Sequence, residues 1–195
     1  METEFPSASE TKSLPAPPIY AVMAGEINQF TLHRLFHVIT TAAQNDGRAV
    51  HLLLQSTGGT PQDGVALYNF LKGFPIATTV YNVGTVSSAA TTGYLGAPIR
   101  IASKYASFMI HRPYASPQFL NPERMQAQLA GLVIDDDRTE AIMRAETKIP
   151  AERWETHKSA DLWLTAQEAK DFGLVTEIAE FAPPARSLVL NVLPG

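Results

Sequence analysis

The sequence contains no cysteine, which excludes disulfide bonds, thiolate metal ligands and a cysteine nucleophile. Charged residues make up only 17%, the net charge is −4, and lysine and arginine form no cluster, which argues against nucleic acid as the main partner. No apolar run approaches the ~18–20 residues that span a bilayer. The 195 residues, 45% of them hydrophobic, predict one domain with a sizeable core.

The first 18 residues, METEFPSASETKSLPAPP, are polar and rich in proline and serine. They offer little apolar surface to bury, so a disordered N-terminal arm is predicted at residues 1–18. They also lack the apolar segment of a secretory signal. Together with the missing membrane span, this predicts a cytoplasmic protein.

The rest of the chain alternates strand-like and helix-like segments. Thr31 is predicted to cap a helix over residues 32–44, and Thr60, followed by Pro61, to cap the next one. The alternation predicts an α/β fold with a parallel layer and loops at the carboxyl ends of its strands. Three strands are predicted around these two helices: Ile19–Met23, Ala49–Gln55 and Ile76–Val83.

Ser88 lies where the third predicted strand, ending in a glycine, gives way to a patch of small residues in YNVGTVSSAATTGYL. A serine at the first turn of a helix lies among unpaired N–H groups at the positive end of the helix dipole. That environment suits a nucleophile whose reaction builds an oxyanion. A serine that only caps a tightly packed helix gives the same pattern.

Two further strand ends carry residues of interest. Gly58 and Gly59 follow the second strand, and a glycine loop there either directs N–H groups at a developing negative charge or forms a plain turn. His111 follows a short predicted strand, Ala106–Ile110, and is the only histidine after Ser88 that closes a strand.

Two groups have side chains of metal-binding type. His33 and His37 are four residues apart on a predicted helix, but no acidic residue or third ligand accompanies them, which favours ordinary surface histidines. Asp135, Asp136 and Asp137 are consecutive on a helix and so point to different faces, which favours a solvated face or a partner contact. No metal site is predicted.

The longest predicted helix covers residues 122–147 and is capped by Asn121. A helix of this length after a compact core predicts a projecting arm that contacts other subunits. A second short helix at 150–157 is expected to fold back, and Thr165 and Glu168 form a capping box at the start of a last one. The segment SLVLNVL in the tail pairs with a strand or docks on a partner.

The chain resembles the Clp protease proteolytic subunit, a ClpP-like serine peptidase of the crotonase-like ββα superfamily. Four segments carry the resemblance, in this order: QSTGGTPQDGVALYNFL, NVGTVSSAATTG, ASFMIHRP and DLWLTAQEAKDFGLV. The family shows N-S-P-G-G, G-Q-A-A-S-M, M-I-H-Q-P and an Asp before Y-G-L-V-D. The resemblance, carried by residues 19–177, implies a ββα superhelix core with a projecting helical handle at about 120–160. The ClpP-like protease domain is accordingly assigned to residues 19–182, with a tail at 183–195.

The resemblance implies a role for five residues. Ser88 aligns with the nucleophile, His111 with the general base and Asp161 with the carboxylate that orients the imidazole. The backbone N–H groups of Gly59 and Ala89 would form the oxyanion hole. No cofactor and no metal is implied.

The implied activity is a serine endopeptidase that hydrolyses peptides or unfolded proteins through an acyl-enzyme. The family assembles as a homo-oligomer, a heptameric ring or stacked rings. The sequence has no Walker A motif, so processive cleavage would depend on a separate AAA+ unfoldase.

Three departures from the family pattern bear on assembly and partners. Leu162 follows Asp161 where the family has an arginine that helps two rings to contact each other. Pro61 lacks an N–H group in the segment that lies beside the substrate strand. The N-terminal region is shorter and lacks the opening segment that forms the axial pore and meets the ATPase.

Three alternatives stay open at this point. The chain could be a catalytically silent scaffold subunit of the same fold, or a relative specialised for processing membrane proteins or phage capsids. A crotonase-superfamily acyl-CoA enzyme is the third, because that fold also directs two N–H groups at an oxyanion. It would not need the set of Ser88, His111 and Asp161.

Overall fold

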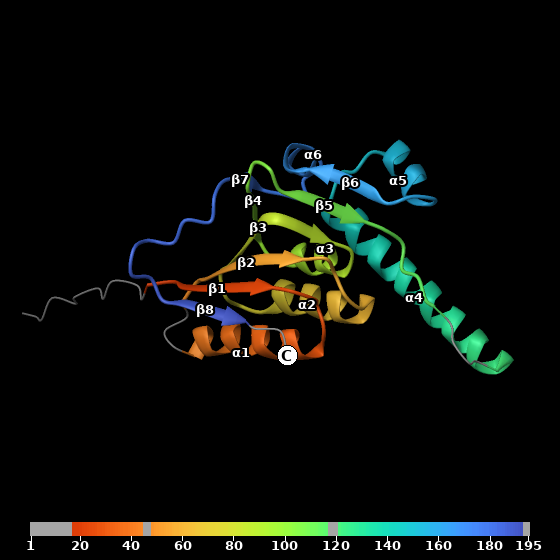
Figure 1. Ribbon diagram of the computed structural model, residues 1–195, viewed down its shortest axis with the longest axis horizontal. Coiled ribbons are helices and arrows are strands. Elements are labelled where there is room, and N and C mark those ends of the chain that lie inside the picture. The colour runs from red at the N-terminus through yellow and green to blue at the C-terminus, as the bar shows by residue number, and fades with distance from the viewer. Residues whose placement is uncertain (1–16, 45–47, 117–120, 193–195) are drawn as a thin grey trace, which may run out of the picture.

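The computed structural model describes residues 17–44, 48–116 and 121–192 (Figure 1). The arm predicted at residues 1–18 therefore lies outside the described residues, except for its last two positions. Within the described part, no helix is both long enough and apolar enough to cross a membrane.

One sheet forms the centre of the protein. Its main path runs β6-β5-β3-β2-β1-β8, and β4 pairs with β3 and β7 beside that path. All neighbouring strands are parallel except β5 and β6. The strands of the described residues are β1 (Ile19–Ala24), β2 (Val50–Ser56), β3 (Thr78–Ser87), β4 (Ile99–Ala102), β5 (Ser107–Ile110), β6 (Leu162–Thr165), β7 (Glu177–Ile178) and β8 (Val189–Val192).

Helices pack against this sheet, and one of them projects from it (Figure 1). They are α1 (Gln29–Gln44), α2 (Pro61–Gly73), α3 (Ala89–Tyr94), α4 (Pro122–Glu146), α5 (Ala151–His157) and α6 (Ala166–Asp171). Alternate residues of β1 and β2 are buried, so one face of these strands enters the core with α1 and α2. The α/β fold with a parallel layer that the sequence predicts is confirmed.

The helix caps agree with the sequence in three places and differ in one. Asn121 caps α4, because its side-chain oxygen accepts a hydrogen bond from the N–H of Arg124. Thr60 caps α2, and Thr165 caps α6 in a complete capping box with Glu168, as predicted. The prediction that Thr31 caps α1 is wrong. Asn28 does so, because its side-chain oxygen accepts hydrogen bonds from the N–H groups of Phe30 and Thr31, and the Thr31 hydroxyl accepts from the N–H of Asn28.

Strand β3 is longer than the sequence predicts. It was expected to end at Val83, before Gly84, but it continues to Ser87. The Gln55 side chain explains the glycine, since its oxygen accepts a hydrogen bond of 2.7 Å from the Thr85 N–H, and a Cβ on Gly84 would lie 2.4 Å from that oxygen. Gly84 thus makes room for Gln55 where the β2–β3 register shifts, and β3 runs directly up to Ser88.

The end of the chain joins the sheet. Residues 189–192 form β8, which pairs in parallel with β1 along the sheet edge. Of the two possibilities for the SLVLNVL segment, the structure therefore shows pairing within the chain. The strand before it, β7, has only two residues.

Helix α4 projects from the body of the protein, as the sequence predicts (Figure 1). Every residue from 121 to 131 is exposed, so the first half of α4 gains no burial from the described residues. The other end is held to α2, where Glu146 accepts hydrogen bonds of 2.7 Å from Tyr68 and from Lys72. The predicted second helix of the handle is α5, which returns toward the sheet.

Helices α2 and α3 approach each other closely, and this contact sets the position of the segment after β3. A Cβ added to Gly64 of α2 would lie 2.5 Å from the carbonyl oxygen of Ala89, the first residue of α3. Only a residue without a side chain fits there.

We expect Gly64→Ala to lower the free energy of unfolding by about 1–3 kcal/mol, because the added methyl forces the two backbones apart. Urea denaturation measures the change. Gly73→Ala is the matched control, since Gly73 ends the same helix and a Cβ there would meet nothing within 4 Å. Equal stability of the two variants would contradict this account of the α2–α3 contact.

Candidate active site

Ser88 occupies a sharp turn between β3 and α3. Its backbone has φ 55° and ψ −130°, a conformation that residues other than glycine rarely adopt and that costs about 1–3 kcal/mol. The Ser88 N–H donates a 2.8 Å hydrogen bond to the carbonyl of Met109 in β5, which ties the turn to the neighbouring strand. Strain maintained in this way at a strand-to-helix turn is typical of a serine whose hydroxyl is presented for reaction.

His111 contacts that hydroxyl. Its Nε2 lies 2.7 Å from Ser88 Oγ, which is a hydrogen-bond distance. The contact follows from the topology, because β3 and β5 are parallel neighbours with Ser87 opposite Met109. Their carboxyl ends therefore meet, and the two predicted residues come together although they are 23 positions apart.

The glycine loop after β2 lies against the same serine. A Cβ on Gly58 would lie 2.7 Å from Ser88 Cβ, and the φ of Gly58 is +114°, so this position requires glycine on both counts. The N–H of Gly59 donates to no described residue, and no side chain caps α3, which begins with Ala89. Sequence reasoning assigned the oxyanion hole to Gly59 and Ala89 but missed the packing role of Gly58. The only sign of that role in the sequence is the pair of consecutive glycines.

Asp161 reaches the same cleft without completing a contact to His111. Strand β6 is antiparallel to β5 with Leu162 opposite Ile110, so the next position in that register brings Asp161 across from His111. The side chain of Asp161 is exposed and forms no hydrogen bond or ion pair with any residue the structure describes. The structure thus brings the three predicted residues to one place and pairs two of them.

The three side chains line an open cleft of about 1170 Å³. Its walls come from the glycine loop, from the segment after β5, and from α4 and α5 of the handle. A cleft of this size accommodates an extended peptide segment.

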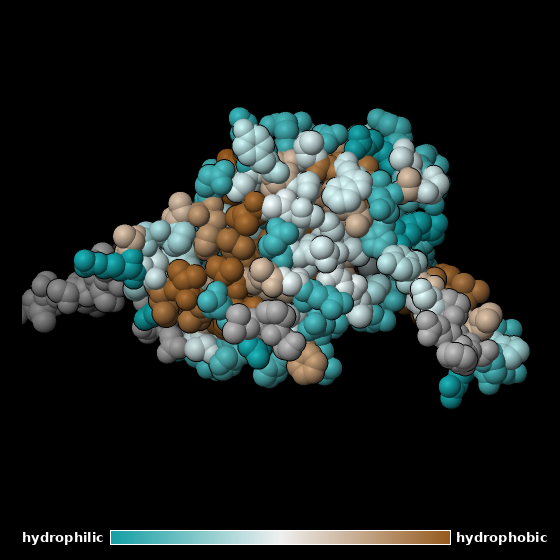
Figure 2. Space-filling model, in the orientation of Figure 1, coloured by the Kyte–Doolittle hydropathy of each residue, from teal (hydrophilic) through white to brown (hydrophobic). Residues whose placement is uncertain are grey.

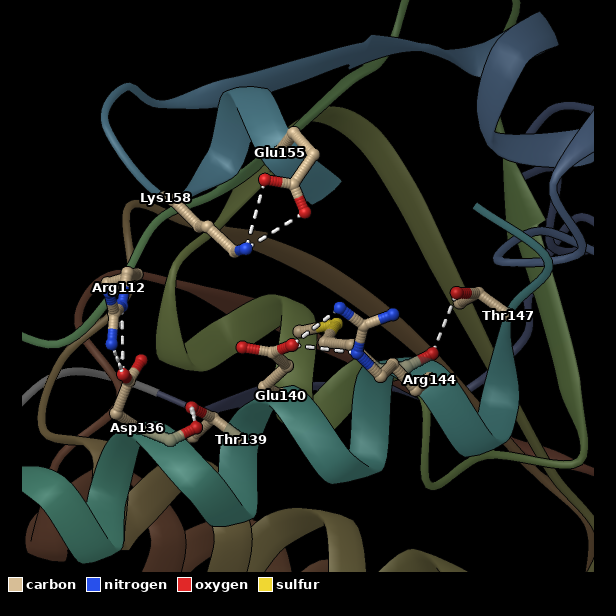
Figure 3. A network of polar contacts seen from close by, with 9 residues as sticks. Arg112, Asp136, Thr139, Glu140, Arg144, Thr147, Glu155 and Lys158 are labelled. Carbon is tan, nitrogen blue, oxygen red and sulfur yellow. Dashed lines mark hydrogen bonds and ion pairs between the residues drawn. The ribbon is translucent and has the colours of Figure 1, made fainter. Parts of the chain in front are cut away.

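Charged residues of α4 form pairs along one wall (Figure 3). Arg112, directly after His111, binds Asp136, and Arg138 binds Asp135 at 2.7 Å. The prediction of a solvated face or partner contact is therefore wrong for these two aspartates, because each is mostly buried and paired with an arginine. Asp137 alone is exposed.

His157 is a buried group of this wall that sequence reasoning missed. Its ring is edge-on to that of Trp154, with 5.1 Å between the ring centroids. Its buried Nε2 has no hydrogen-bond partner among the described residues. Burial lowers the pKa of His157, while the nearby carboxylates of Glu140 and Asp136 oppose that shift. No pattern in the sequence separates this histidine from a surface one.

Within the described ranges, no three histidine, aspartate or glutamate side chains gather in a way that could hold a metal ion. His33 and His37 are both exposed on α1, away from the cleft.

The fold and the cleft define an α/β protein with a serine–histidine pair at the carboxyl ends of two parallel strands. The chain belongs to the Clp protease family, whose sequence model matches residues 19–182. It is 24% identical, over 177 residues, to ATP-dependent Clp protease proteolytic subunit 3 of Rhizobium johnstonii, covering 90% of this chain and 91% of the relative. It is 26% identical, over 176 residues, to an ATP-dependent Clp protease proteolytic subunit of Paracoccus denitrificans, covering 89% and 87%.

A solved structure shows the same fold. A variant of ClpP1 from Listeria monocytogenes superimposes with a TM-score of 0.72 at 24% identity, covering 83% of this chain and 91% of that one. The resemblance inferred from the four sequence segments is confirmed by these matches, and so is the expected ClpP-like fold.

The buried His157 predicts a pH dependence of stability. Because its pKa is lowered in the folded state, the unfolded chain binds a proton that the folded chain does not once the pH falls below about 6.5. The free energy of unfolding therefore decreases as the pH falls through this range. We expect His157→Gln to lose less stability than the wild type between pH 7.5 and pH 5.5 in urea denaturation.

His37→Gln is the matched control, because it removes an exposed histidine from α1. If the free energy of unfolding of His157→Gln falls with pH as steeply as that of His37→Gln, His157 is not the source of the pH dependence.

Proposed function

We propose that this protein is a serine endopeptidase that cleaves peptides or unfolded proteins through an acyl-enzyme. The observation that carries the proposal is the 2.7 Å contact between Ser88 Oγ and His111 Nε2, made from a strained backbone. A serine hydroxyl is a weak nucleophile until an adjacent base takes its proton. Its place in a peptide-sized cleft of a Clp protease family member supports the same activity.

The reaction follows from the positions of these groups. His111 accepts the proton of Ser88 as Oγ attacks the scissile carbonyl carbon, and the resulting oxyanion accepts hydrogen bonds from the N–H groups of Gly59 and Ala89. When the tetrahedral intermediate collapses, the C–N bond breaks and the imidazolium gives its proton to the leaving amine. Water then attacks the acyl-enzyme with His111 again as the base, which releases the acid and restores Ser88.

Asp161 is assigned the third role in this proposal. Once it accepts a hydrogen bond from His111 Nδ1, it holds the imidazole in the tautomer that leaves Nε2 free to take the serine proton. The antiparallel register of β5 and β6, with Leu162 opposite Ile110, supports this role, and in the proposal a movement of the segment before β6 completes the triad. We propose that assembly of subunits drives this movement.

The exposed surface of α4 supports assembly. Met125, Leu129 and Val133 recur every four residues along one side of the helix and are 51%, 61% and 51% exposed. Figure 2 shows hydrophobic residues on the projecting arm. An apolar stripe on a helix that the described residues leave uncovered is a surface for other subunits, and the proposed oligomer is a homo-oligomeric ring.

The curated relatives are named ATP-dependent, whereas this sequence holds no Walker A motif. If the protein shares that dependence, a separate ATPase of the AAA+ class supplies the unfolding. This partner belongs to the proposal for protein substrates, and cleavage of short peptides does not require it.

A catalytically silent scaffold subunit is the second candidate. It is favoured by one observation, the unpaired and exposed carboxylate of Asp161. The two candidates differ in whether the oligomer reacts at Ser88.

A fluorophosphonate probe tests the proposed activity, because it phosphonylates only an activated serine. We expect labelling of the wild type confined to the peptide that contains Ser88, and loss of labelling in Ser88→Ala. Ser87→Ala is the matched control and should still be labelled, since no side-chain contact joins Ser87 to His111. A correctly assembled oligomer without any labelling would favour the scaffold.

The apolar stripe gives a second prediction. Leu129→Asp is expected to reduce the oligomeric mass in light scattering and, with it, peptidase activity, because a carboxylate would be buried without a partner. Ala127→Asp is the control, because positions two apart do not share a helix face. An unchanged mass in Leu129→Asp would contradict the role of the stripe.

A further inference from the structure

An ion pair joins the chain directly after His111 to the handle. Both Nε and Nη2 of Arg112 bind the same carboxylate oxygen, Oδ2 of Asp136 in α4 (Figure 3). The Arg112 side chain is 49% exposed but that of Asp136 only 13%, so the arginine reaches inward from the surface. Because the carboxylate is largely shielded from water, its attraction to the guanidinium is stronger than in a fully exposed ion pair.

The Arg112–Asp136 pair is next to His111 in the chain, so it affects the position of that histidine. Strand β5 ends at Ile110, and residues 111–116 have no regular secondary structure. The ladder between β3 and β5 ends at Ser87 and Met109, so His111 lies beyond the last paired residue. Asp161 forms no contact that would hold the imidazole. Three contacts therefore hold this segment beyond the sheet: the Arg112–Asp136 pair, the hydrogen bond between His157 and the His111 backbone, and the ring contact between His111 and Tyr114. Among them, only the Arg112–Asp136 pair joins the segment to α4.

The other end of the anchor is firmly placed. Asp136 lies in the second half of α4, whose last turn is bound to α2 through Glu146, Lys72 and Tyr68. Oδ1 of Asp136 is buried and has no hydrogen-bond partner among the described residues. Arg112, which binds Oδ2, is therefore the counter-charge of this carboxylate. Removal of the arginine would leave a buried carboxylate without its counter-charge and would free the segment that carries His111 and residue 112 from α4.

We propose that Arg112 is a positioning residue, which holds His111 at hydrogen-bond distance from Ser88 by binding Asp136 of the handle. The inference deepens the proposed function and rests on it. The clamp, defined as the Arg112–Asp136 pair, also transmits a displacement of α4 to the imidazole. The position of α4 and the reactivity of Ser88 are thereby coupled through this ion pair, beside the hydrogen bond between His157 of α5 and the His111 backbone.

The test measures the saturation kinetics of fluorophosphonate labelling at Ser88 in the full chain. Arg112→Ala should lower the maximal inactivation rate constant by about ten- to a hundredfold, because a misplacement of about 1 Å has effects of this order. The oligomeric mass should stay unchanged, since the apolar stripe of α4 is intact. The loss should appear in the maximal rate constant and not in the probe concentration at half-saturation, because Arg112 acts on His111 and not on the probe. A merely structural role would lower the oligomeric mass or raise the half-saturation concentration as well.

Reversal of the pair separates positioning from damage. The double variant Arg112→Asp with Asp136→Arg restores opposite charges at the same two places, and it should recover most of the lost rate constant. The matched control is Lys72→Ala. It breaks another ion pair of α4 with nearly the same exposure, 52% for Lys72 and 14% for Glu146, at the end of the helix away from His111.

The outcomes distinguish the two proposals. Unchanged labelling in Arg112→Ala overturns the clamp, and so does an equal loss in Lys72→Ala, which would show general loosening of α4. A reversed pair as slow as Arg112→Ala overturns it too. If the wild-type oligomer is not labelled at all, the proposed function fails first and the clamp fails with it.

Discussion

The pairing of β3 with β5 is the constraint on which the rest of the site depends. Parallel neighbours end at the same edge of a sheet, so the residue after one strand meets the residue after the other. This brings Ser88 and His111 to 2.7 Å, and the hydrogen bond from the Ser88 N–H to Met109 maintains the unfavourable backbone of the serine. The serine turn is thus held by main-chain contacts, whereas the His111 side chain lies beyond the last paired residue of β3 and β5 and depends on further contacts.

Small residues and the handle complete the site from opposite sides. Gly58 and Gly64 allow the glycine loop and α2 to approach the serine turn and the start of α3 at distances that exclude any Cβ. On the other side, α4 and α5 contribute charged and buried polar groups, including Asp136 and His157. The first side is rigid through packing, whereas the second depends on ion pairs and on a helix that is half exposed. A change of activity with assembly would therefore act through the handle.

Sequence reasoning succeeded at most local signals, although it chose Thr31 over Asn28 as the cap of α1, and it failed where a distant group decided. Thr60 and Thr165 were predicted as caps because a cap bonds within three residues of itself. Gly84 was misread as a strand end because the side chain that it accommodates, Gln55, belongs to another strand. Asp136 was misread as solvated or as a partner contact because its partner, Arg112, is 24 residues away. Asp135 was misread although its partner, Arg138, is only three residues away, because its burial depends on packing.

By itself the sequence determined the chemistry available, the alternation that predicts a parallel layer, and the family, since four short segments carry that resemblance. It also named Ser88, His111 and Asp161 as candidates. Only the tertiary structure decided that the first two are in contact while Asp161 is not, that residues 189–192 close the sheet edge, and that Arg112 binds the handle. These are contacts between segments far apart in the chain, and their distances depend on packing, which no local pattern specifies.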